Sequence, residues 1–259
     1  FNSVGMLLLV AGFAFSFQLT GFFEQFLYRD PIMLSRQTPY QQITLTQWNK
    51  DARLFKNGNL QFSSVDEYRY HEALIHVPMS LVKHPENVLI LGGGDGLAIR
   101  EILKYEGIQK ITLVDLDKEM THLGANHPKL IQLNLGAMQD ERVEVVNLDA
   151  YKFIENSSEL YQVVIIDLPD PNDASLGKLY SKEFYQLLRK RMAYGGVAVT
   201  QSTSPYFAPE AFWCIHQTME SIFPYTLPYH TYVPSFGEWV FNLSTYLPPP
   251  LFPSPPLPF

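Results

Sequence analysis

Cysteine is almost absent from this chain of 259 residues, and acidic residues outnumber basic ones. The single cysteine, Cys214, excludes an internal disulfide and a cysteine-based metal site, which favours a reducing compartment. We expect it to be a small core residue on a helix. The net charge of −7 argues against a nucleic-acid-binding protein and is compatible with a cationic small substrate. Because His71, His76 and His84 lack metal-ligand spacing, no metal site is predicted.

Charged residues are also missing from the first 23 positions. The apolar run over residues 5–23 approaches the about 20 residues needed to cross a bilayer, so we expect a transmembrane segment within residues 1–28. An apolar helix packed on the domain is the alternative. The apolar run is followed by the basic residues Arg29, Arg36, Lys50 and Arg53. Their position predicts a catalytic domain on the cytoplasmic side of the cell membrane. Residues 246–259 are rich in proline and are predicted to be a disordered tail.

Two patterns of secondary structure follow one another between these ends. Residues 40–65 contain alternating runs, and Asn57-Gly58 between two of them is typical of a β-hairpin, so residues 29–66 are assigned to a small antiparallel unit. From residue 88, strands alternate with helices. This rhythm predicts an α/β fold over residues 67–245, with a doubly wound, mostly parallel, Rossmann-like sheet of the class I methyltransferase type.

Acidic residues gather where a doubly wound sheet binds its ligand, beyond the carboxyl ends of its strands. The aspartates predicted at these ends are Asp95, Asp115, Asp149 and Asp167. In "VVIIDLPDPND", a buried-looking strand runs into Asp167, and prolines fix the loop that carries Asp170. An ordinary turn between a strand and a helix needs at most one capping aspartate, so this loop is a candidate site.

The glycine loop "GGGDG" follows the first strand of this domain and lets the backbone approach a ligand at Gly92 and Gly94. A dinucleotide-binding loop needs glycine or alanine where Leu97 stands, so the spacing fits an adenosylmethionine-like nucleoside better. Asp115 is then placed for the ribose hydroxyls. Asp149 is placed for the adenine amino group, with helix capping as the alternative role.

Asp95 adds information about the ligand. Its negative charge falls where the amino-acid end of the ligand would lie, so it would repel the carboxylate of S-adenosylmethionine. A decarboxylated ligand that ends in an ammonium group would be attracted. The alternative is that Asp95 stabilises the loop or the helix that follows.

Several segments together resemble one family. They are "YQQITL", "NGNLQFSSVDEYRYHEALIHVPM", "VLILGGGDGLAIREILKY", "VDLD", "DERVEVVNLDAYKFI" and "YQVVIIDLPDP". In this order they resemble the polyamine aminopropyltransferases, typified by spermidine synthase, over residues 38–244. The apolar N-terminus is similar to the membrane-anchored variant of that family.

The resemblance implies an enzyme that transfers an aminopropyl group from decarboxylated S-adenosylmethionine to a diamine such as putrescine, giving spermidine and methylthioadenosine. No cofactor is implied, and a homodimer is expected. Asp167 would be the proton acceptor. The implied nucleoside-binding residues are Gln41, Gly92, Gly94, Asp115, Asp149 and Ala150. The residues implied for the aminopropyl group and the polyamine are Tyr70, His71, Asp95 and Asp170.

The chain departs from the family pattern in places. Asp115 stands where the family usually has glutamate, and the loop in "YVPSFGEWVF" is shortened, so a family tyrosine that contacts the polyamine falls near His230 or Tyr232. After Leu243 the closing helix and strand of the family are replaced by the proline-rich tail. Two alternative functions therefore remain, which are a methyltransferase on the same fold and a non-catalytic, membrane-tethered polyamine or nucleoside sensor.

Aromatic residues such as Phe236 and Trp239 are expected in the core, with a lid on the amine channel as the alternative.

Overall fold

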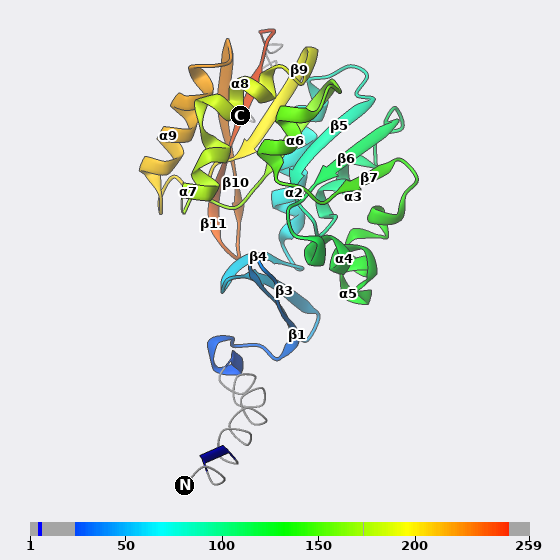
Figure 1. Ribbon diagram of the computed structural model, residues 1–259, viewed down its shortest axis with the longest axis vertical. Coiled ribbons are helices and arrows are strands. Elements are labelled where there is room, and N and C mark those ends of the chain that lie inside the picture. The colour runs from blue at the N-terminus through cyan, green and yellow to red at the C-terminus, as the bar shows by residue number, and fades with distance from the viewer. Residues whose placement is uncertain (1–4, 7–23, 173, 249–259) are drawn as a thin grey trace, which may run out of the picture. The chain divides into compact units, whose positions relative to one another are not determined.

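The computed structural model describes residues 5–6, 24–172 and 174–248 of the chain. It divides into two compact units, which span residues 1–65 and 66–259. Each unit has its own sheet, and each is described by itself (Figure 1).

The predicted membrane segment lies almost entirely outside the described residues, as does most of the predicted tail. Within the part that the structure describes, no helix has both the length and the apolar character needed to cross a bilayer. Membrane attachment through residues 5–23 therefore stays a prediction.

The N-terminal unit is built on an antiparallel sheet in which consecutive strands pair. Its strands are β1 (Ile32–Gln37), β2 (Gln42–Trp48), β3 (Asp51–Lys56) and β4 (Asn59–Ser63). The predicted hairpin is confirmed, since β3 and β4 are joined at Asn57 and Gly58, whose φ angles of 50° and 78° suit a tight two-residue turn. Strand β1 was not anticipated because "IMLSRQ" lacks a clear apolar alternation.

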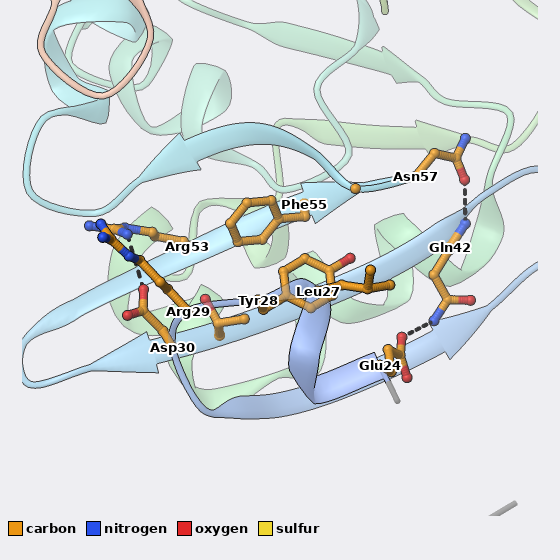
Figure 2. A pocket seen from close by; sticks show the side chains of 11 residues that line it. Glu24, Leu27, Tyr28, Arg29, Asp30, Gln42, Arg53, Phe55 and Asn57 are labelled. Carbon is orange, nitrogen blue, oxygen red and sulfur yellow. Dashed lines mark hydrogen bonds and ion pairs between the residues drawn. The ribbon is translucent and has the colours of Figure 1, made fainter. Parts of the chain in front are cut away.

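This unit contains a cavity of about 600 Å³. Figure 2 shows the side chains that line it. Tyr28 and Phe55 supply apolar walls, and Arg53 forms an ion pair with Asp30 at 3.0 Å. None of the described residues that line the cavity belongs to the predicted site.

The C-terminal unit contains a seven-stranded sheet in the order β10-β11-β9-β8-β5-β6-β7 (Figure 1). Its strands are β5 (Asn87–Gly92), β6 (Lys110–Val114), β7 (Val143–Val146), β8 (Tyr161–Asp167), β9 (Met192–Gln201), β10 (Tyr225–Val233) and β11 (Gly237–Thr245). Strands β5 to β9 pair in parallel, and β11 and β10 add an antiparallel edge. The predicted fold class is confirmed. Strand β10 was missed because it contains Pro228, which is tolerated on an edge strand.

Helices cover both faces of this sheet (Figure 1). The α-helices are α2 (Glu67–Ser80), α3 (Leu97–Ile102), α4 (Lys118–Asn126), α5 (Pro128–Asn134), α6 (Ala150–Asn156), α7 (Ala174–Gly177), α8 (Lys182–Arg189) and α9 (Pro209–Glu220). Short 3-10 helices lie at η1 (Ala137–Gln139) and η2 (Lys178–Tyr180).

Alternate residues of the central strands enter two apolar cores, one on each face of the sheet. On one face Ile90 and Ile165 pack with side chains of α2 and α3. On the other face Leu91 and Ile166 pack with side chains of α6, α8 and α9. Because both faces are covered, these strands are apolar throughout, which is typical of a parallel sheet.

Cys214 lies on α9 as expected, but it is exposed, so its interpretation as a core residue is wrong. Helix α9 buries Phe212, Ile215, His216 and Met219. At about 100° per residue these side chains centre on the side of the helix opposite to position 214.

Candidate active site

The four aspartates all lie at the carboxyl ends of the parallel strands. Asp167 is the last residue of β8, and Asp115 directly follows β6. Asp95 lies in the loop between β5 and α3, and Asp149 precedes α6 after β7. The sheet therefore brings the predicted acids to a single edge, where α/β folds of this kind bind ligands.

Asp167 is held by a tyrosine from α2. The Tyr70 hydroxyl donates to Asp167 Oδ1 at 2.5 Å, across 97 positions of sequence. Burial and then the charge of Asp167 raise the pKa of Tyr70 well above its ordinary value, so the phenol keeps its proton and remains a donor. One lone pair of the carboxylate is thereby engaged, and its orientation is fixed.

Asp170 is held by a glutamine that sequence reasoning missed. Gln201 ends β9, and its Nε2 donates to Asp170 Oδ1 at 3.0 Å and to the Leu168 carbonyl at 2.6 Å. Its Oε1 accepts from the Trp239 indole at 3.2 Å and from the Thr203 amide at 3.0 Å. With obligate donors on one side and acceptors on the other, the amide has one allowed orientation. Its place at the carboxyl end of a strand was the available signal.

Aromatic side chains from the β10–β11 hairpin surround Tyr70. The Phe236 and Trp239 rings lie 6.0 and 6.5 Å from the Tyr70 ring, and 5.0 Å from each other, in edge-on contacts. Both rings are half-buried and form an aromatic wall beside Tyr70, and Trp239 also packs against the core on one face of the sheet. Their alternative role as a lid on the amine channel stays a prediction. The Asp66 carboxylate fixes this turn by accepting from Ser235 N at 2.7 Å and Ser235 Oγ at 3.0 Å.

His230 and Tyr232, the positions near which the family tyrosine was expected, are directed away from this wall. Thr231 is the residue that pairs with Trp239, and neighbouring residues of a strand point to opposite faces. Tyr232 is exposed, and the Nδ1 atom of exposed His230 lies 2.8 Å from Glu238 Oε2. Trp239 and Phe236 occupy the Tyr70 side instead.

The glycine loop approaches the protein's own acids very closely. Gly92 has a φ of 87°, and a Cβ on it would lie 2.1 Å from the Asp167 carbonyl oxygen. Gly94 donates its amide to Asp115 Oδ2 at 3.1 Å, and a Cβ there would lie 2.6 Å from the same atom. These glycines hold the candidate site together, and their contact with a ligand stays a prediction.

Replacing Gly94 with alanine is expected to lower the free energy of unfolding by about 1–3 kcal/mol, since the new methyl group overlaps Asp115 and approaches Met120 Cγ to 3.1 Å. Denaturant unfolding would measure this. Gly177→Ala is the matched control because it has ordinary helical φ and nothing within 4 Å of its Cβ position. Equal stability of the two variants would contradict the tight packing inferred at Gly94.

Asp95, which lies in the glycine loop, and Asp115 also receive backbone hydrogen bonds. Asp115 Oδ1 accepts from Asp117 N at 2.8 Å, and Asp95 Oδ1 accepts from Leu97 N at 2.9 Å. The loop-stabilising role considered for Asp95 is therefore present. Contact of either carboxylate with a ligand stays a prediction.

Asp149 caps α6, since its Oδ1 accepts from Lys152 N at 3.2 Å. Its Oδ2 forms an ion pair with Lys178 at 2.7 Å. Burial raises the pKa of Asp149, but Lys178 and the Lys152 amide outweigh it and lower the pKa below its ordinary value. Ala150, the first residue of α6, is buried. The capping role is thus present, and adenine binding by Asp149 and Ala150 stays a prediction.

Gln41 lies in the N-terminal unit, in the turn between β1 and β2. Its backbone amide donates to Thr38 Oγ1 at 3.0 Å. Its predicted role toward a nucleoside stays a prediction.

His71 is buried and is bound by Glu67, and Glu67 is bound by Arg100; sequence reasoning missed both residues. The Nδ1 atom of His71 lies 2.7 Å from Glu67 Oε2, and Glu67 in turn pairs with Arg100 of α3 at 2.8 Å. The spacing of Glu67 and His71, four residues apart on a predicted helix, was a usable signal. Arg100 could not be paired with Glu67 from sequence, because the packing of α2 against α3 decides it.

Fold and site together define a Rossmann-like α/β domain with an acidic ligand edge. A family profile described as the spermine/spermidine synthase domain matches residues 67–247. The chain therefore belongs to the spermine/spermidine synthase family.

Individual relatives agree with this assignment. The polyamine aminopropyltransferase of Leptospira interrogans is 50% identical over 241 residues, which cover 93% of this chain and 48% of the relative. That of Oceanobacillus iheyensis is 50% identical over 238 residues, which cover 92% and 46%. A spermidine synthase solved with the transition-state analogue AdoDATO has a TM-score of 0.79 at 29% identity, over 83% of this chain and 74% of that one. The chain spans about half the length of the curated relatives it matches.

Proposed function

We propose that this protein transfers an aminopropyl group from decarboxylated S-adenosylmethionine to putrescine, giving spermidine and methylthioadenosine. One observation carries the proposal, namely two carboxylates fixed from different elements. Tyr70 of α2 orients Asp167, and Gln201 of β9 orients Asp170 three residues later. Family membership supports the reaction class.

The chemistry requires such a pair of acids. The nitrogen of the diamine attacks the methylene carbon next to the sulfonium, a C–N bond forms, and the C–S bond breaks with its electron pair going to sulfur. The leaving group is a neutral thioether, so it needs no acid. The attacking amine has a pKa near that of lysine, about 10.4, and must lose a proton. Asp167 accepts that proton, and Asp170 anchors the substrate as a cation.

The remaining residues bind and orient the two substrates. Asp95 attracts the ammonium group of the aminopropyl chain and repels a carboxylate at that position. Asp115 and Asp149 accept hydrogen bonds from the nucleoside. The half-buried rings of Phe236 and Trp239 enclose the methylene chain of the diamine and exclude water.

The test is to incubate the protein with putrescine and with either decarboxylated or intact S-adenosylmethionine, and to measure methylthioadenosine and spermidine. Product from the decarboxylated form alone is expected. Turnover of the intact form to S-adenosylhomocysteine would favour the methyltransferase. Binding of the decarboxylated nucleoside without turnover would favour the sensor. Membrane anchoring and homodimer formation remain separate predictions.

Replacing Gln201 with glutamate is expected to raise the KM for putrescine about 10–100-fold and to leave the affinity for the nucleoside unchanged. The carboxylate would lose its hydrogen bonds to Asp170 and Leu168 and would repel the acid, a cost of about 1–3 kcal/mol. Steady-state kinetics and calorimetry separate these effects. Gln186→Glu, on an exposed position of α8, adds the same charge as a control. An unchanged KM would contradict the role given to Gln201.

A further inference from the structure

The hydroxyl of Tyr180 lies against the loop that carries Asp170, and the reaction as described does not use it. Tyr180 ends η2 and is 6% exposed. Its Oη donates toward two backbone carbonyls, at 3.1 Å from that of Leu168 and 3.0 Å from that of Pro169. The same oxygen lies 3.1 Å from Gln201 Nε2. One hydroxyl therefore contacts both the backbone that precedes Asp170 and the amide that holds the Asp170 carboxylate.

Packing alone requires the ring of Tyr180 and not its hydroxyl. The ring belongs to the apolar core on the face of the sheet that α6, α8 and α9 cover. A buried hydroxyl costs stability unless it is hydrogen-bonded, so a phenylalanine would fill the same space without that cost. Burial raises the pKa of Tyr180 well above its ordinary value, so the phenol keeps its proton and remains a donor. The hydroxyl is therefore best understood through the loop that it contacts.

This loop takes its hydrogen-bond donors from outside. The pairing of β8 ends at Asp167, and Pro169 and Pro171 have no backbone N–H. The carbonyls at positions 168 and 169 lie beyond the last strand pairing, and the side chains of Tyr180 and Gln201 supply donors to them. These hydrogen bonds fix the direction in which the chain leaves the strand toward Asp170.

The start of α8 in turn fixes Tyr180. Ser181 caps this helix, since its Oγ accepts from Phe184 N at 3.2 Å. Phe184 and Leu188 of α8 are buried in the same core as the Tyr180 ring. The hydroxyl therefore comes from a packed helix start and reaches a carbonyl that lies 12 positions earlier in the chain.

We propose that Tyr180 is a positioning residue that holds Asp170 in place for the cationic end of the diamine. This inference rests on the proposed function and deepens it. Asp167 lies before the loop, and Tyr70 holds it independently. Loss of the Tyr180 hydroxyl should therefore weaken the binding of the amine more than it slows the chemical step.

The first test is Tyr180→Phe, which keeps the ring and removes the hydroxyl. The KM for putrescine is expected to rise about tenfold, while kcat changes by less than about threefold and the nucleoside affinity stays that of the parent. Tyr161→Phe is the matched control, because it removes the hydroxyl of a buried tyrosine at the opposite end of β8, where it donates to Glu159 at 3.0 Å. An unchanged KM in Tyr180→Phe, with or without a lowered melting temperature, would overturn the proposal.

A double-mutant cycle shows whether Tyr180 acts through Asp170. Tyr180→Phe is combined with Asp170→Asn, and the KM for putrescine is measured for each protein of the cycle. In the Asp170→Asn background the loss of the hydroxyl should change the KM by less than about twofold, because the anchoring charge is already absent. An equal change in both backgrounds would mean that Tyr180 acts elsewhere, and it would overturn the proposal.

A measurement without substrates separates this inference from the proposed function. The side-chain amide hydrogens of Gln201 are observed by NMR and assigned through their loss in Gln201→Glu. They should exchange with solvent about tenfold faster in Tyr180→Phe than in the parent or in Tyr161→Phe. Equal exchange rates would overturn the hold of Tyr180 on the loop. If exchange accelerates but no methylthioadenosine forms in the parent protein, the proposed function fails and that hold stands.

Discussion

An Asp167→Asn variant is expected to transfer aminopropyl groups about 10²–10⁴-fold more slowly than the parent protein, because it removes the proton acceptor from the amine. The asparagine carbonyl oxygen can still accept the Tyr70 hydrogen bond, which is 2.5 Å long in the parent. The packing of the site should therefore survive. The rate of methylthioadenosine release at saturating substrates measures the effect.

Two comparisons make this result specific. Calorimetry should find the decarboxylated nucleoside bound with the parent affinity, and Glu220→Gln, at an exposed position at the end of α9, should keep full activity although it loses the same charge. Raising the pH toward the pKa of the amine, about 10.4, should recover part of the lost rate because less substrate then needs deprotonation. A variant as fast as the parent would show that another group is the base.

An Asp95→Asn variant is expected to bind decarboxylated S-adenosylmethionine about 10–100-fold more weakly and to bind the intact form more tightly. The change removes an attraction to ammonium of about 1.5–3 kcal/mol and, at the same time, a repulsion of carboxylate. The asparagine can still accept from Leu97 N, so the loop should hold. Calorimetry with both nucleosides measures the difference.

The ratio of the two affinities is the decisive quantity for Asp95. Glu141→Gln, at an exposed position, is the control for loss of one negative charge and should leave the ratio as it is in the parent. If both affinities fall equally in Asp95→Asn, the residue acts only by stabilising the loop. That was the alternative interpretation of Asp95 from the sequence.

The parallel part of the fold could be predicted because its strands are covered on both faces and read as apolar runs between helices. Strand β10 could not, since an edge strand needs no continuous apolar face and here contains Pro228. The helices α4 and α5 are short and are separated only by His127, so their pattern is weak over so few residues. Exposed Cys214 shows that residue type alone does not fix the face of a helix.

The acids of the site could be predicted because strand ends meet at one edge of a parallel sheet. Their partners could not, because Tyr70 comes from α2 and Gln201 from β9, and only tertiary packing brings them to Asp167 and Asp170. Asp149 shows the reverse difficulty. An aspartate at this position can cap a helix or bind a ligand, so the sequence does not separate the two roles. The structure shows that Asp149 caps α6.

Helix α2 carries contacts to three separate parts of the domain within two turns. Glu67 contacts α3, Tyr70 contacts the end of β8, and the Ala73 carbonyl accepts from Tyr229 of β10 at 2.9 Å. Each residue of an α-helix advances by about 100°. Substituting Glu67 or Tyr70 removes one of these contacts, and the main-chain contact at Ala73 does not depend on its side chain. A single inserted or deleted residue, in contrast, turns all the positions after it away from their partners. The spacing along α2 is therefore under a tighter constraint than the identity of most of its side chains.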